Sequence, residues 1–199
     1  MGVKIAVYGG IGSGKSSAAD IIRGLDYCVV DCDKVYQNQV LEDCAYRDML
    51  VSRYGDEIVN DGRIDTRALG KIIYADKAEK AWLDSVAHPL IMAEVGRQLD
   101  EHKLAFAEVP LLYESGYKDM FDAAILITCD IDTRVSRLVA SRYAAEGEDY
   151  VRRAAAAQAS DDERKSIADY VVDNSGSIED LKANIIHIIG DIKARFNIA

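Results

Sequence analysis

The sequence predicts an α/β protein in which a parallel five-stranded sheet is flanked by helices. Five short apolar runs alternate with longer segments of helical character, the pattern expected when helices join parallel strands. A glycine-rich turn separates the first run from a segment that favours a helix. Of the 199 residues, 49% are hydrophobic and 29% charged, so the chain can bury one core and is neither disordered nor fibrous.

The predicted strands are the apolar runs at residues 3–8, 27–30, 104–109, 123–129 and 170–172. Periodicity alone does not separate such short runs from buried helix segments, so the assignment depends on their alternation with helical stretches. Sheets of this kind bind ligands at the carboxyl ends of their strands, and we expect the active site there.

A long insert, at about residues 33–103, lies between the second and third strands and contains no clear strand. Apolar residues recur in it at near-helical spacing from Trp82 to Leu99, and we expect Pro89 to interrupt or kink that helix after His88. We therefore predict a helical subdomain inside a single domain that spans residues 1–199.

The residues after the first strand read G-G-I-G-S-G-K-S at positions 9–16, which satisfies the pattern G-x-x-x-x-G-K-[ST]. This is a P-loop, whose backbone N–H groups and following helix surround the phosphates of a nucleoside triphosphate. Lys15 should reach the β- and γ-phosphates, and Ser16 should hold Mg²⁺. The alternative is a glycine-rich turn with a solvated lysine. The segment's predicted ATP-binding residues are Gly10, Ile11, Gly12, Ser13, Gly14, Lys15, Ser16 and Ser17.

Three carboxylates follow predicted strands. Asp31 and Asp33 come after the second strand and point to one side if the strand persists. Beside a bound Mg–triphosphate, one could accept a proton from an attacking hydroxyl and the other could hold water of the metal shell. Glu108 ends the third strand, where it could bind Mg²⁺ through water. The alternatives are a helix N-cap for the aspartates and an ordinary strand-end carboxylate for Glu108.

Arginines concentrate after the fourth strand, beside the predicted nucleotide site. Phosphoryl transfer needs preorganised cations, and we assign that role to Arg137 and Arg142. Arg134 shares a helical face with Arg137, whereas Arg152 and Arg153 fit a solvated basic face equally well. Residues 142–158, rich in Ala, Arg and Glu, are predicted to form a mobile lid over the nucleotide.

Other segments carry weaker signals. Pro110 should stiffen the turn after the third strand so that Leu111 and Tyr113 form an apolar wall for an acceptor. By pattern alone, His88 is a packed or capping residue. Asn174 fits a turn or a helix cap, and it could also contact the base of the nucleotide.

Composition limits the class of partner and the compartment. A net charge of −10 opposes nucleic acid as a main partner, because binding a polyanion relies on Lys and Arg. No apolar stretch approaches the ~20 residues that a membrane helix needs, and no signal peptide is evident. The four cysteines lack C-x-x-C spacing, so we expect reduced thiols, no zinc site and a cytoplasmic location.

Several segments together resemble the dephospho-CoA kinase family. They are the P-loop at 9–16, V-D-C-D at 30–33, G-R-I-D at 62–65, H-P-L-I at 88–91, P-L-L-Y-E at 110–114 and A-D-Y-V-V-D-N-S-G at 168–176. The P-loop indicates only an NTPase, whereas H-P-L together with P-L-L-aromatic-E narrows the resemblance to this family. The similarity covers nearly the whole chain.

The resemblance implies a kinase that uses ATP and Mg²⁺ to phosphorylate the ribose 3′-hydroxyl of dephospho-CoA, the final step of coenzyme A synthesis. It also implies that Asp33 is the base, that the insert lines the acceptor site and that Arg142 lies on a lid. The implied acceptor-binding residues are Asp33, Arg63, His88, Leu111, Tyr113 and Glu114. The chain departs from the family pattern mainly at Gln158-Ala159-Ser160, where Gln-Met-Pro is common, so the contacts of the lid are open.

Two alternatives remain at this point. The first is another P-loop kinase that acts on nucleotides or nucleosides. The second is a P-loop regulatory switch, which would need a guanine-reading Asn-Lys-x-Asp motif that the sequence lacks.

Overall fold

The computed structural model describes residues 2–198 and contains two compact units. The sheet unit comprises Met1–Val30 and Gln98–Ala199, and the helical unit comprises Asp31–Arg97. Among the described residues, no helix is both long enough and apolar enough to cross a membrane.

The sheet has five parallel strands in the order β2-β5-β1-β6-β7, so the predicted fold class is confirmed. Its central strand β1 pairs with β5 through Val7 opposite Glu108, and with β6 through Val7 opposite Ile125. The strands are β1 (Val3–Tyr8), β2 (Cys28–Asp31), β5 (Leu104–Glu108), β6 (Ala123–Thr128) and β7 (Tyr170–Asp173). Each lies within one residue of its predicted bounds at either end, and the three inner strands β5, β1 and β6 are the most deeply buried of these apolar runs.

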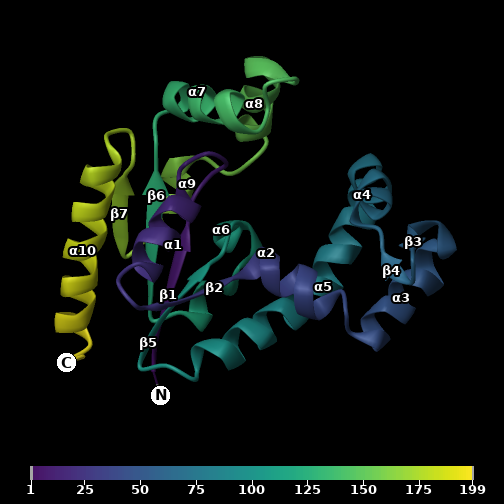
Figure 1. The fold of residues 1–199 in the computed structure, drawn as a ribbon, viewed down its shortest axis with the longest axis horizontal. Coiled ribbons are helices and arrows are strands. Elements are labelled where there is room, and N and C mark those ends of the chain that lie inside the picture. The colour runs from purple at the N-terminus through teal and green to yellow at the C-terminus, as the bar shows by residue number, and fades with distance from the viewer. Residues whose placement is uncertain (1, 199) are drawn as a thin grey trace. The chain divides into compact units, whose positions relative to one another are not determined.

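One face of the sheet packs against α1 (Lys15–Arg23) and α10 (Ile178–Arg195), which lie side by side (Figure 1). The inward residues of α10 are Leu181, Ile185, Ile188, Ile189 and Ile192. They form one core cluster with alternate residues of the strands, such as Ile5 and Val7 of β1. The sheet and α10 thereby fix the position of α1, which begins directly at the P-loop.

The remaining helices of the sheet unit follow β5 and β6. They are α6 (Leu112–Ser115), a 3₁₀ turn at Tyr117–Met120, α7 (Ile131–Ser141), α8 (Gly147–Ala156) and α9 (Asp161–Lys165). Figure 1 shows α7 and α8 beyond the carboxyl end of β6. An ion pair of 2.7 Å between Arg152 and Asp132 joins these two helices.

The helical unit contains a β-hairpin that the sequence analysis did not predict. The strands β3 (Val59–Asn60) and β4 (Arg63–Ile64) pair in antiparallel orientation through the two-residue turn Asp61-Gly62. Both turn residues have positive φ angles, of 48° and 75°, as a type I′ hairpin turn requires. The Asp61-Gly62 pair was the sequence signal for this hairpin. The strands were not predicted because two residues are too few to form a recognisable apolar run.

The helices of this unit are α2 (Cys32–Val35), a π-helical turn (Tyr36–Val40), α3 (Cys44–Tyr54), a 3₁₀ turn (Asp56–Ile58), α4 (Thr66–Ala75) and α5 (Lys77–Leu99). Helix α5 runs without interruption past Pro89, so the expected interruption after His88 is wrong, whereas a kink there stays a prediction. Proline removes one backbone hydrogen bond, and here the contacts of the flanking turns hold the helix together. Leu83, Ala87, Met92 and Val95, on both sides of Pro89, are all buried.

Asp169 links three elements of the sheet unit and supports a testable pH dependence. Its carboxylate accepts the N–H of Ala124 at 2.9 Å and pairs with Lys118 at 3.1 Å and Arg195 at 3.0 Å. Burial acts to raise the pKa of this carboxyl, but the bonds from Arg195 and Lys118 outweigh it, so the pKa is lowered. Since the folded-state pKa lies below the unfolded value, the stabilisation is present above about pH 4 and is lost as pH falls further.

Asp169→Asn should therefore lower the free energy of unfolding at pH 7 by about 1–3 kcal/mol, seen as a melting temperature lower by roughly 2–10 °C. The difference from wild type should shrink as the pH is lowered below about 4. Thermal melts followed by circular dichroism at both pH values measure it. An equal difference at both would show that the charge of Asp169 does not stabilise the fold.

Candidate active site

The P-loop connects β1 to α1 by a turn that glycines make possible. Gly12 and Gly14 have φ angles of 70° and 95°, which other residues rarely adopt. Helix α1 begins at Lys15, and no side chain caps its N-terminus. Its first N–H groups therefore remain available to phosphate oxygens, whose charge the positive end of the helix dipole favours.

Lys15 and Ser16 lie where the motif predicts them. The ammonium of Lys15 donates to the carbonyl oxygens of Gly9 at 2.9 Å and Gly10 at 3.0 Å, so it lies across the turn. The hydroxyl of Ser16 donates to the Glu108 carboxylate at 2.7 Å. Glu108 ends β5, next to β1, and is 7% exposed. The fold thus places a hydroxyl from the first turn of α1 in contact with a carboxylate from the end of β5.

This pair fits a Mg²⁺ ion, because hydroxyl and carboxylate oxygens are hard ligands. The described residues contain no cluster of three or more His, Cys, Asp or Glu side chains that could hold a metal by themselves. A magnesium ion at Ser16 and Glu108 would therefore depend on phosphate oxygens and water for its other ligands, as is usual for Mg²⁺ at nucleotide sites.

Asp31 does not have the geometry expected for a pair with Asp33. The strand ends at Asp31 and α2 begins at the next residue, so the two side chains do not alternate along a strand. The Asp31 carboxylate caps α2 by accepting the N–H of Lys34 at 3.1 Å. The N-cap alternative is therefore confirmed for Asp31, and its proposed place in the metal shell has no support from this geometry.

Asn174 anchors the P-loop, a role that the sequence analysis did not predict. Its side-chain amide donates to the carbonyl of Ser13 at 2.8 Å, and its backbone N–H donates to Thr128 at 2.8 Å. It is 5% exposed and packs so closely on Gly14 that a Cβ atom there would overlap its amide nitrogen. The N-cap of α10 is Ser177 instead. Asn174 thus ties the end of β7 to the phosphate-binding turn.

Replacing Asn174 by aspartate should weaken nucleotide binding. The variant keeps the size of the side chain but directs a carboxylate oxygen, instead of an N–H donor, at the Ser13 carbonyl. We expect the dissociation constant for ADP to rise about 5- to 100-fold, equivalent to about 1–3 kcal/mol. Titration calorimetry measures the change, with Asn184→Asp on the exposed side of α10 as the matched control. Equal affinities for both variants would exclude an anchoring role.

The two arginines predicted to be catalytic differ in their surroundings. Arg137 donates to the carbonyl of Asn174 at 2.8 Å and to that of Gly176 at 3.1 Å, and so holds the loop after β7. Arg142 follows the last residue of α7 and is exposed, and its side chain forms no ion pair with any described residue. The catalytic role of each stays a prediction.

Two other arginines lie closer to the P-loop. Guanidinium atoms of Arg134 and Arg164 lie 2.7 and 3.2 Å from where a Cβ atom on Gly10 would be. Arg134 donates to the Cys129 carbonyl at 2.6 Å and forms an ion pair with Asp161. Arg164 is 1% exposed. Both residues are among the arginines that follow the fourth predicted strand, and the sequence does not distinguish these buried side chains from solvated ones.

Arg164 also engages a residue predicted to bind the acceptor. It donates to Glu114 at 2.8 Å, and Glu114 also accepts the N–H of Ala159 at a longer 3.4 Å. Leu111 and Tyr113 are half-buried on either side of Leu112, which lies in the core. The structure therefore gives Glu114 a partner within the sheet unit, and the wall formed by Leu111 and Tyr113 stays a prediction.

The remaining acceptor candidates belong to the helical unit. Asp33 is exposed in the first turn of α2, and Arg63 is exposed on β4 with its Nε 3.6 Å from a Glu42 oxygen. His88 is half-buried in α5, with its Nε2 3.9 Å from an Asp84 oxygen. The predicted residues thus divide between the units, with the phosphate-binding set on the sheet unit and these three on the helical unit.

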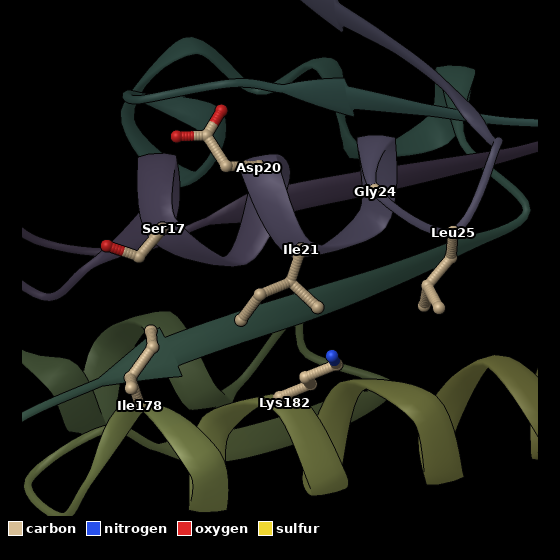
Figure 2. Close-up of a pocket in the computed structure, with 7 residues that line it drawn as sticks. All are labelled: Ser17, Asp20, Ile21, Gly24, Leu25, Ile178 and Lys182. Atoms are coloured by element: carbon tan, nitrogen blue, oxygen red, sulfur yellow. The ribbon is translucent and has the colours of Figure 1, made fainter.

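Ser17 lines a hollow of about 450 Å³ between α1 and α10 (Figure 2). Ile21 of the same helix and Ile178 and Lys182 of α10 line the hollow with it (Figure 2). Any contact of Ser17 with ATP is therefore expected to come from its backbone N–H at the start of α1.

Comparisons with known proteins identify the family of the chain. The family model for dephospho-CoA kinase matches residues 3–180. A dephospho-CoA kinase of Corynebacterium glutamicum is 36% identical over 196 residues, covering 96% of this chain and 100% of the relative. One from Thermobifida fusca is 32% identical over 199 residues and covers 98% of both chains.

Solved structures show the same fold. TT1252 from Thermus thermophilus has a TM-score of 0.79 at 28% identity, covering 96% of this chain and 97% of that one. A shikimate kinase from Acinetobacter baumannii, at a TM-score of 0.55 and 13% identity, shares the fold alone and covers 97% of this chain and 96% of its own. The family match and the full-length relatives together show that the chain belongs to the dephospho-CoA kinase family.

Proposed function

We propose that this protein transfers the γ-phosphoryl group of ATP to the ribose 3′-hydroxyl of dephospho-CoA. The observation that carries the proposal is the joint presence of full-length family similarity and an assembled P-loop, with Lys15 across the turn and Ser16 against Glu108. In the reaction the acceptor oxygen forms a bond to the γ-phosphorus, the bond to the β-phosphate oxygen breaks, and ADP leaves. The hydroxyl proton must pass to a base.

The site residues of the sheet unit have the following roles in this proposal. The backbone amides after Gly12 and the start of α1 bind the phosphates, and Lys15 neutralises the charge that develops on the transferred group. Ser16 and Glu108 would hold Mg²⁺, which supplies further neutralisation when bound. Arg142 lies at the start of the predicted lid, residues 142–158, whose closure would exclude water and so prevent hydrolysis of ATP.

The helical unit is proposed to bind the acceptor and supply the base. Asp33 takes the proton of the 3′-hydroxyl, and His88 and Arg63 contact dephospho-CoA. Support comes from their place in the segments that resemble the family and, for Asp33 and Arg63, from their exposure to solvent. A cytoplasmic location and the lack of a nucleic-acid partner stay predictions from the sequence.

The test is ADP formation from Mg–ATP with dephospho-CoA, with AMP, with other nucleoside monophosphates and with no acceptor, followed by the mass of the product. We expect ADP formation to require dephospho-CoA and to yield coenzyme A. Turnover with a different acceptor would keep the P-loop kinase assignment and reject this substrate. Hydrolysis without an acceptor would favour a regulatory NTPase.

A further inference from the structure

Gln158 contacts the P-loop from a distant part of the chain. It lies between α8 and α9, and its side-chain oxygen accepts the backbone N–H of Ile11 at 2.8 Å across 147 positions of sequence. The same oxygen lies 3.6 Å from where a Cβ atom on Gly10 would be. The backbone of Ile11, the third residue of the P-loop, is thus held by a side chain outside the loop, and Gly10 lies beside that side chain.

The residues after Gln158 are themselves fixed from several sides. Arg164 donates to the carbonyl of Ala159 and to Glu114, and its own carbonyl accepts the hydroxyl of Tyr8 at 2.7 Å. Asp161 forms an ion pair with Arg134, which belongs to α7, the helix that follows β6. Gln158 is half-buried and adjoins a hydrogen-bonded network centred on Arg164, which is 1% exposed, so the chain next to Gln158 is tied to the sheet unit at several points.

The P-loop needs such support because glycines occupy four of its first six positions, 9–14, and glycine loses the most backbone entropy on ordering. A fixed acceptor for the N–H of Ile11 removes alternative turn conformations before the nucleotide arrives. Preorganisation of this kind improves affinity by lowering the cost of ordering at the moment of binding.

We infer that Gln158 is a positioning residue for the nucleotide, which acts through the Ile11 N–H on the shape of the P-loop. This inference extends the proposed function and depends on it only for the identity of the nucleotide. It also divides the predicted lid: residues before Gln158 can move over the nucleotide, whereas Gln158 itself is the anchored end.

The test compares Gln158→Leu, which removes the acceptor at similar size, with Gln158→Asn, which shortens the side chain, and Gln158→Glu, which keeps an acceptor oxygen. Asp162→Asn is the matched control, because the Asp162 side chain is 92% exposed and its ion pair is with Lys165 of the same helix. The readouts are the ¹H–¹⁵N resonance of the Ile11 amide, the dissociation constant for ADP, KM for both substrates and the melting temperature.

For the Leu and Asn variants we expect the Ile11 amide proton to move upfield and to exchange faster with solvent. The ADP dissociation constant and KM for ATP should rise about 2- to 12-fold, the effect of one net hydrogen bond. KM for dephospho-CoA should stay within about twofold of wild type. The Glu variant should restore the resonance of Ile11, and the control should match wild type throughout.

Two outcomes would overturn the inference. An unchanged Ile11 resonance in both the Leu and Asn variants would mean that the bond is not formed. A lower melting temperature with unchanged ADP affinity would reduce Gln158 to a structural residue. The Ile11 resonance, the melting temperature and the ADP affinity are all measured without an acceptor. A failure to phosphorylate dephospho-CoA would therefore reject the proposed function and leave this result intact.

Discussion

Replacing Lys15 by alanine is expected to lower kcat about 10²- to 10³-fold and to weaken the binding of ATP and ADP. The ammonium is the cation that the motif directs at the β- and γ-phosphates, and removal of one preorganised group of this kind has effects of that size. The structure adds a second cause, because Lys15 donates to the carbonyls of Gly9 and Gly10 and so helps to close the turn. Both effects act at the phosphate site.

The measurement is steady-state kinetics with varied ATP, together with ADP titration and a melting curve in the absence of nucleotide. Lys165→Ala is the control, since it removes the same charge from the sheet unit at a half-exposed ion pair with Asp162. Unchanged kinetics for Lys15→Ala would remove the P-loop assignment itself. A melting temperature equal to wild type would show that the loss is local to the phosphate site.

The sheet was predictable from the sequence because its strands are buried among other elements and therefore consist of apolar residues. Ile5 and Val7 of β1 and Ile125 and Ile127 of β6 are fully buried, and their runs stand out against the helices around them. The hairpin around Asp61-Gly62 was missed because its strands have two residues each and lie outside the main core. The interruption predicted at Pro89 was wrong because tertiary packing maintains α5 where local propensity would break it.

The site was predictable where the chemistry lies in consecutive residues and unpredictable where it depends on the fold. The places of Lys15 and Ser16 follow from the motif, and Glu108 was expected at this edge of the sheet because it ends a strand. By contrast, the bond from Ile11 to Gln158 joins parts of the chain whose proximity no spacing reveals. The same is true of Asn174, whose sequence context indicates a turn but whose side chain donates to the carbonyl of Ser13, 161 positions earlier in the chain.

Charge balance explains why the arginine-rich segment was harder to interpret. The sequence does not show whether an arginine is exposed or buried, because that depends on which acidic side chains the fold places beside it. Arg164 is buried because Glu114 and Asp161 lie within 2.8 and 3.7 Å of its guanidinium, and a buried charge requires such partners. Arg142 has no such partner among the described residues, so its side chain is available to an anionic ligand.

Asp33→Asn is expected to lower kcat about 10²- to 10⁴-fold, the usual contribution of a general base, while the affinity for ATP stays within about twofold of wild type. The amide keeps the size of the side chain and its place in the first turn of α2 but cannot accept the proton of the 3′-hydroxyl. The phosphate-binding residues belong to the sheet unit, whereas Asp33 belongs to the helical unit. This separation of turnover from nucleotide binding distinguishes a base from a structural residue.

Asp43→Asn is the matched control for this substitution. Asp43 caps α3 in the same unit by accepting the N–H of Tyr46 at 2.8 Å, and asparagine is an equally good N-cap, so kcat should be unchanged. The acidic limb of the pH–rate profile, caused in wild type by protonation of the base, should also disappear from Asp33→Asn and persist in the control. If Asp33→Asn turned over as fast as wild type, the base would have to be sought elsewhere. An equal loss in kcat and ATP affinity would instead indicate that Asp33 acts on the nucleotide, because a base that touches only the acceptor cannot change ATP binding.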